Sequence, residues 1–146
     1  MKILSTVLIA AALITLAGPA AAERYGEQKV VYHVNDFARA NAALRNIGNH
    51  LDATGDDRTD IVVVTHSGGI NFLLDNAQDK KGNTFEMDVL NLSKRGVEFR
   101  VCANTLSARN LDEGDYSMLE EVIEVVPSGV AEVAHLQQQG YVLLKP

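Results

Sequence analysis

An uninterrupted apolar run constrains the fold of this chain more than any other feature of the sequence. It reads Ile61-Val62-Val63-Val64 within the segment 59–65, and apolar and polar residues do not alternate along it. A strand with one face in water alternates, whereas a strand that is apolar on both faces is covered on both sides. We therefore predict a central strand of a parallel sheet at this position.

Strand-like and helix-like patterns alternate along the rest of the chain. Further strands are predicted at 29–34, 97–102, 122–126 and 141–144, and helices at 37–54, 83–96, 103–110 and 130–139. Asp36 is a predicted N-cap, and Asn83 with Glu86 resembles a capping box. This order predicts a three-layer α/β domain of the flavodoxin or Rossmann kind, with a mainly parallel five-stranded sheet and helices on both faces.

The first 22 residues have the composition of a secretory signal peptide. Lys2 precedes an apolar run over 3–16, Gly18-Pro19 breaks the pattern, and Ala20-Ala21-Ala22 fits a cleavage site. The run is shorter than the roughly 20 apolar residues of a membrane span. We predict a cleaved signal at 1–22, one domain at 23–146, a periplasmic location and no membrane insertion after cleavage.

Net charge and cysteine usage narrow the function. The chain carries a net charge of −6, and loss of Lys2 with the signal makes it more acidic, which argues against a nucleic-acid partner. Cys102 is the single cysteine, so no internal disulfide can form in an oxidising compartment. It is then a buried inert thiol, an intermolecular bridge or a reactive thiol.

Cys102 ends a predicted strand where a helix begins, a position at which backbone N–H groups favour the thiolate. His66 ends the central strand, so the carboxyl ends of parallel strands bring it near Cys102. We take Cys102 and His66 as candidate catalytic residues. Further candidates for the same pocket lie at neighbouring strand ends or along the following helix: Asn35, Asp36, Ser67, Gly68, Asn104, Arg109 and Ser128.

Structural roles remain open for these residues. Free cysteine is among the most buried residue types, His66 can simply bond the adjacent turn, and His33 is interpreted as a satisfied core histidine. A soft-metal site at His66 and Cys102 lacks a defined third ligand. Common nucleotide, zinc and dithiol motifs are absent, and Thr65 stands where a nucleophile elbow needs glycine. We predict no cofactor.

Five segments together resemble the DsrE/DsrF-like family, which has the YchN-like fold. They are KVVYHVND at 29–36, ALRNIGNHL at 43–51, DIVVVTHSGG at 60–69, GVEFRVCANTL at 96–106 and VVPSGVAEVAHLQQQGYVLLKP at 125–146. The resemblance implies a five-stranded parallel sheet and a homo-oligomer, a trimer or hexamer. Members that act in sulfur relay carry sulfur as a persulfide on a cysteine in this region, which implies that role for Cys102.

Two functions follow as expectations. In the first, the protein is a sulfur carrier that exchanges sulfur with a donor or acceptor protein, and any enzymatic activity is at most sulfur transfer. In the second, it is a non-catalytic oligomeric module that binds a small molecule, an anion or a soft metal at the strand ends. The polar face of strand 97–102, with Tyr116, Met118 and Leu119 in an acidic segment, predicts contacts beyond one subunit.

Overall fold

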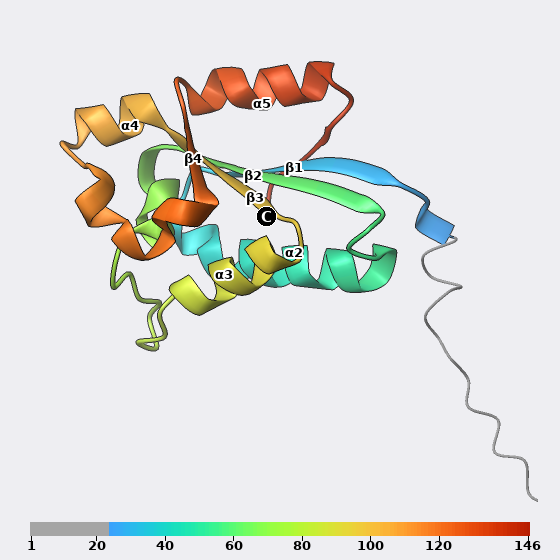
Figure 1. The fold of residues 1–146 in the computed structure, drawn as a ribbon, viewed down its shortest axis with the longest axis horizontal. Helices are drawn as coiled ribbons and strands as arrows, with labels where there is room; N and C mark the ends of the chain where they lie inside the picture. Colours follow the sequence, from blue (N-terminus) through green and yellow to red (C-terminus); the bar gives the residue numbers. More distant parts are fainter. Residues whose placement is uncertain (1–23) are drawn as a thin grey trace, which may run out of the picture.

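The computed structural model describes residues 24–146, which form a sheet between two layers of helices (Figure 1). The predicted signal, 1–22, lies outside the described residues. The strands are β1 Gln28–Val34, β2 Thr59–Thr65, β3 Glu98–Cys102, β4 Ile123–Val126 and β5 Val142–Leu144. The helices are α2 Ala40–Thr54, α3 Glu86–Lys94, α4 Ala103–Ala108 and α5 Gly129–Gln138. Four 3-10 helices complete the chain: η1 Phe37–Arg39, η2 Ser67–Leu73, η3 Glu113–Asp115 and η4 Ser117–Val122.

All strand pairs of the sheet are parallel, in the order β4-β3-β2-β1-β5. The strand with the uninterrupted apolar run, β2, lies in the middle and pairs with β1 and β3 over their length. Both the three-layer α/β class and the central place of this strand are therefore confirmed. The carboxyl ends of β1, β2 and β3 meet at one edge, which places the candidate residues there.

The core lies on both faces of the sheet but is unequal. Alternate residues of β2 divide between the two faces: Ile61 and Val63 join the large cluster beneath α2 and α3, while Val62 and Val64 join a smaller one. The smaller cluster is closed by Val133 and Leu136 of α5, and Figure 1 shows this helix running along one side of the sheet, opposite α2 and α3. Each of these buried aliphatic side chains contributes about 1.5–3 kcal/mol.

Local signals explain where most elements begin and end. Asp36 accepts a hydrogen bond from the Ala38 N–H at 2.9 Å, which starts η1 one turn before α2. The predicted capping box at Asn83 is wrong, because α3 begins at Glu86 with no side-chain cap. Asn83 instead donates to Asp79 within the preceding loop, and Glu86 accepts from the Asn76 N–H. Both side chains stabilise a surface loop that the helical pattern alone could not reveal.

The polar face of β3 is covered within the chain. Arg100 forms ion pairs with Glu98 at 2.6 Å, with Glu124 of β4 at 3.0 Å and with Glu132 of α5. The 81% burial of the Arg100 side chain and the 85% burial of the Glu132 side chain make this pair part of the α5–sheet interface. The alternation of β3 therefore needs no partner subunit to explain it.

The acidic segment after α4 is also more internal than its sequence indicates. Tyr116 and Leu119 are buried in the core of this chain, so they do not support the predicted contact between subunits. Met118 is 62% exposed. Across residues 24–146, no helix combines the length and apolar character needed to cross a membrane.

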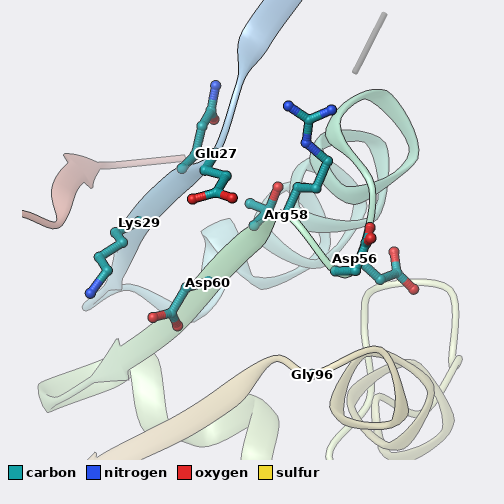
Figure 2. Close-up of a pocket in the computed structure, with 9 residues that line it drawn as sticks. Glu27, Lys29, Asp56, Arg58, Asp60 and Gly96 are labelled. Carbon is teal, nitrogen blue, oxygen red and sulfur yellow. The ribbon is translucent and has the colours of Figure 1, made fainter. Parts of the chain in front are cut away.

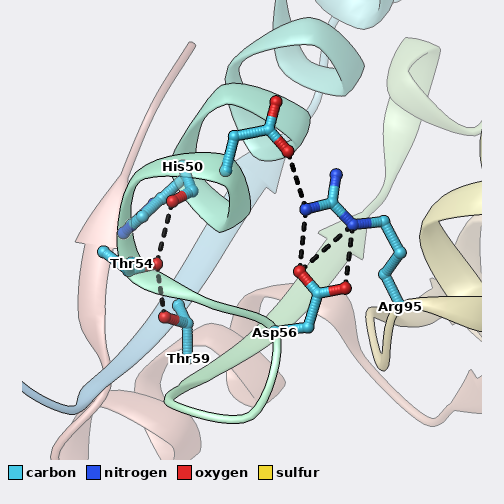
Figure 3. Close-up of polar contacts among 6 residues, drawn as sticks. His50, Thr54, Asp56, Thr59 and Arg95 are labelled. Atoms are coloured by element: carbon cyan, nitrogen blue, oxygen red, sulfur yellow. Dashed lines mark hydrogen bonds and ion pairs between the residues drawn. The ribbon is translucent and has the colours of Figure 1, made fainter. Parts of the chain in front are cut away.

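Polar contacts fix the amino-terminal edge of the sheet (Figure 3). The Arg95 guanidinium binds Asp56 at 2.7 Å and Asp52 at 2.8 Å, and its hydrogen bonds hold the pKa of Asp56 below its usual value. Beside it, the Thr59 hydroxyl donates to Thr54, whose hydroxyl donates to the His50 carbonyl. These contacts connect the end of α2 to the start of β2 and leave the opposite edge for the candidate site.

Candidate functional site at the carboxyl ends of the strands

Cys102 is the last residue of β3 and the residue before α4, as its sequence position predicts. It is 5% exposed and lies on the face of the sheet that α5 covers. A Cβ added to Gly129, the first residue of α5, would lie 3.2 Å from the Cβ atoms of both Cys102 and His66. Glycine at this position therefore lets the start of α5 approach the ends of β2 and β3 closely.

The thiol lies among hydrogen-bond donors from two helix starts. Burial by itself raises the pKa of Cys102, but the N–H of Gly129, the Thr105 hydroxyl and the N–H groups of Thr105 and Asn104 all lower it, although the thiol makes no capping hydrogen bond to α4. Together they outweigh burial and place the pKa of the thiol below its ordinary value. Donors that favour the anion are what a nucleophilic cysteine requires.

Thr105 connects this cradle to the end of β2. The Ser67 N–H donates to the Thr105 hydroxyl oxygen at 3.0 Å, and the same hydroxyl is one of the groups that lower the pKa of Cys102. Ser67 adopts φ 51°, a left-handed conformation that costs a non-glycine residue on the order of 1 kcal/mol. Strain at such a position is common at functional sites, and here it aims an N–H at the hydroxyl that contacts the thiol.

His66 is next to Cys102, but its ring nitrogens are engaged elsewhere. Nδ1 hydrogen-bonds the Ser67 hydroxyl at 2.9 Å, and Nε2 lies 2.7 Å from Nε2 of His33. Burial, followed by the positive charge of Lys145, lowers the pKa of His66. Burial lowers the pKa of His33 as well, with further contributions from His66 and Lys145. Both imidazoles are therefore neutral at neutral pH.

The other predicted pocket residues have mainly structural contacts. Arg109 donates to Asn71 at 2.6 Å and so holds η2, and Ser128 caps α5 by accepting from the Ala131 N–H at 3.4 Å. Asp36 caps η1. Asn35 and Gly68 lie at the exposed turn after β1 and β2. Of the predicted residues, the structure brings together Cys102, His66, Ser67 and the Asn104 backbone, and it leaves the rest at the margin.

Sequence reasoning missed three participants. Thr105 lies three residues beyond the end of β3, and only its hydrogen bond with Ser67 at the end of β2 reveals it. His33 precedes the end of β1 and was interpreted as a core residue, yet it is half-buried and pairs with His66. Lys145 follows β5, the strand beside β1, and a neighbouring-strand register would have been needed to find it.

The structure gives little support to a soft-metal site. Within the described chain, no group of three or more His, Cys, Asp or Glu side chains is arranged to hold a metal ion. A cavity of about 580 Å³ lies instead at the amino ends of β1 and β2, where Figure 2 shows Lys29 and Arg58 among Glu27, Asp56 and Asp60. That cavity is remote from Cys102, at the edge where parallel sheets seldom carry their chemistry.

Comparison with known proteins agrees with this architecture. A model of the DsrE/DsrF-like family matches residues 21–146. The chain belongs to this family. No curated protein matches this chain.

Two solved structures share the fold of this DsrE/DsrF-like protein. MTH1491 of Methanobacterium thermoautotrophicum, a protein of unknown function, is 30% identical in sequence and superposes with a TM-score of 0.70. The match covers 82% of this chain and 100% of the MTH1491 chain. BT1422 of Bacteroides thetaiotaomicron, also of unknown function, is 12% identical with a TM-score of 0.52, over 82% of this chain and 95% of its own, and it shows the fold alone.

Proposed function

We propose that this DsrE/DsrF-like protein is a sulfur carrier that holds sulfane sulfur as a persulfide on Cys102. The observation that carries the proposal is the position of Cys102 at the end of β3, directly before α4 and against the start of α5, where groups of Gly129, Asn104 and Thr105 lower the pKa of a buried thiol. A persulfide is also an anion at neutral pH, so the same groups stabilise the loaded form. Membership of a family associated with sulfur relay supports this chemistry.

The carrier acts in exchange with partners. The proposal includes export by the signal at 1–22 to the periplasm, a homo-oligomer of three or six subunits, and a sulfur donor or acceptor protein. We place the contacts with other chains at the exposed apolar side chains Met118, Val130 and Val142, each of which is more than 60% exposed. Light scattering that finds only monomers at micromolar concentration would contradict the oligomer.

Intact-mass spectrometry tests the carrier function. The mature protein is incubated with a sulfane-sulfur donor, and we expect a gain of one sulfur atom that reducing agent reverses. Cys102→Ser should gain none, whereas Ser107→Ala, a change at an exposed position of α4, should load as the wild type does. Equal loading of wild type and Cys102→Ser, or no loading of either, refutes the proposal.

A further inference from the structure

Four ionisable side chains form a row across the carboxyl edge of the sheet. The last pairs of the register are Thr65 with Val101 and Tyr32 with Leu144, so His66 follows beside Cys102 and His33 beside Lys145. The strand order therefore gives the row Lys145, His33, His66 and Cys102. His33 and Cys102 lie in β1 and β3, whereas Lys145 and His66 directly follow β5 and β2. This row lies on the face that α5 partly covers.

The row can become cationic and lacks an acidic partner. His33 and His66 are 2.7 Å apart through their Nε2 atoms, and Lys145 is near enough to influence both. Within the part of the chain that is described, no carboxylate bonds to either imidazole. The ionisable residues of α5, the helix packed on this face, are Glu132, which pairs with Arg100, and His135, which bonds Gln139.

We infer that His33, His66 and Lys145 bind the anionic end of a small sulfane-sulfur donor, of the thiosulfate class, and present its outer sulfur to Cys102. The inference rests on the proposed carrier function and names its substrate class. Because Cys102 is only 5% exposed, the reacting end of the donor must be narrow, which favours an inorganic dianion over the persulfide of a folded protein.

The transfer balances without a further reactant. The Cys102 thiolate attacks the outer sulfur of thiosulfate, the new S–S bond forms, and the bond between the two sulfurs of the donor breaks. Sulfite leaves with the electron pair of that bond, and Cys102 keeps a persulfide anion. Total charge is unchanged and no proton is consumed. Cationic groups beside the leaving sulfite stabilise the charge that collects on it.

Binding should be linked to protonation of the histidine pair. A bound dianion favours imidazolium, so it raises the pKa of His33 and His66 from their lowered values in the free protein. Thiosulfate therefore binds more tightly as the pH falls toward the lowered pKa values of the free histidines. Cys102→Ser, which cannot react, permits this affinity to be measured by calorimetry.

The decisive experiment compares two donors on four proteins. The full mature chain is loaded with thiosulfate or with cysteine persulfide, and the rate of sulfur gain is followed by mass spectrometry for wild type, His33→Gln, Lys145→Gln and Lys94→Gln. Lys94 is an exposed residue of α3 and serves as the matched control. We expect His33→Gln to slow loading from thiosulfate about tenfold and Lys145→Gln about threefold, with little change for cysteine persulfide or for Lys94→Gln.

Each result decides the matter. Loading from cysteine persulfide but not from thiosulfate, with no binding of thiosulfate to Cys102→Ser, overturns the inference and leaves the carrier function in place. Equal thiosulfate rates in wild type, His33→Gln and Lys145→Gln also overturn it, because the anion then binds elsewhere. No loading from either donor overturns both proposals. Circular dichroism of each variant confirms that a slower rate does not reflect an unfolded protein.

Discussion

Removing the Thr105 hydroxyl tests how the fold favours the Cys102 thiolate. Thr105→Val conserves shape but deletes the hydroxyl that helps to lower the pKa of Cys102. A hydrogen bond to a charged group contributes about 1.5–3 kcal/mol, and the low end applies because sulfur is a weak acceptor. A loss of about 1.4 kcal/mol changes the ionisation equilibrium of the thiol by a factor of ten. We therefore expect the pKa of Cys102 to rise, and the thiolate fraction on the acid side of the titration to fall about tenfold.

The ultraviolet absorbance of the thiolate, followed against pH with Cys102→Ser as the blank, measures this fraction without requiring a reagent to reach a buried sulfur. Thr105→Ser keeps the hydroxyl and should titrate close to the wild type. Thr84→Val makes the same exchange at an exposed loop position and should leave the curve unchanged. Superposable curves for Thr105→Val and the wild type would show that the hydroxyl does not act on the sulfur.

Three further predictions concern stability, each measured by chemical denaturation. Gly69→Ala should destabilise the fold by about 3 kcal/mol or prevent folding, because the new Cβ would lie 1.9 Å from the Val34 carbonyl oxygen. Gly48→Ala in α2 has open space around it and should stabilise the fold by about 0.5–1 kcal/mol. A similar effect of both substitutions would refute the packing argument. Arg100→Ala should lower the free energy of unfolding by about 2 kcal/mol, because it leaves the mostly buried Glu132 unpaired. Arg95→Ala removes a more exposed ion pair and should lower it by less than about 1 kcal/mol. Equal losses would refute this reasoning. Because the folded state lowers the pKa of His33 and His66, the unfolded state binds more protons below about pH 6.5, so stability is full above that pH and declines beneath it. His33→Gln should make the decline shallower, and an unchanged slope would contradict the linkage.

Hydrophobic pattern was sufficient for the architecture. The apolar run of β2 can avoid water only if both faces of the strand are buried, and the structure places this strand in the centre of the sheet. Element ends were less predictable where side chains compete for partners. Asn83 is of a residue type that often caps helices. Its side chain and its backbone N–H both donate to Asp79 instead, so α3 starts three residues later.

The candidate site was predictable in place but not in composition. Position at the end of β3 was enough to find Cys102, and the neighbouring strand end was enough to find His66. The groups that act on them come from other parts of the chain. No local pattern states that Thr105 will accept from the Ser67 N–H, or that His33 will face His66 at 2.7 Å, since both facts depend on how the helices pack and how the strands register.

The donor from Gly129 has a consequence for how the protein matures. This N–H opens α5, and α5 follows Cys102 in the chain only after η3, η4 and β4. A chain in which α5 has not docked therefore lacks the largest of the contributions that lower the pKa of Cys102, while Thr105 and Asn104 of α4 still contribute theirs. Docking of the C-terminal segment completes the sheet and activates the sulfur in the same step. Thiol acidity then reports completed folding, and truncation before residue 129 should raise the pKa of Cys102.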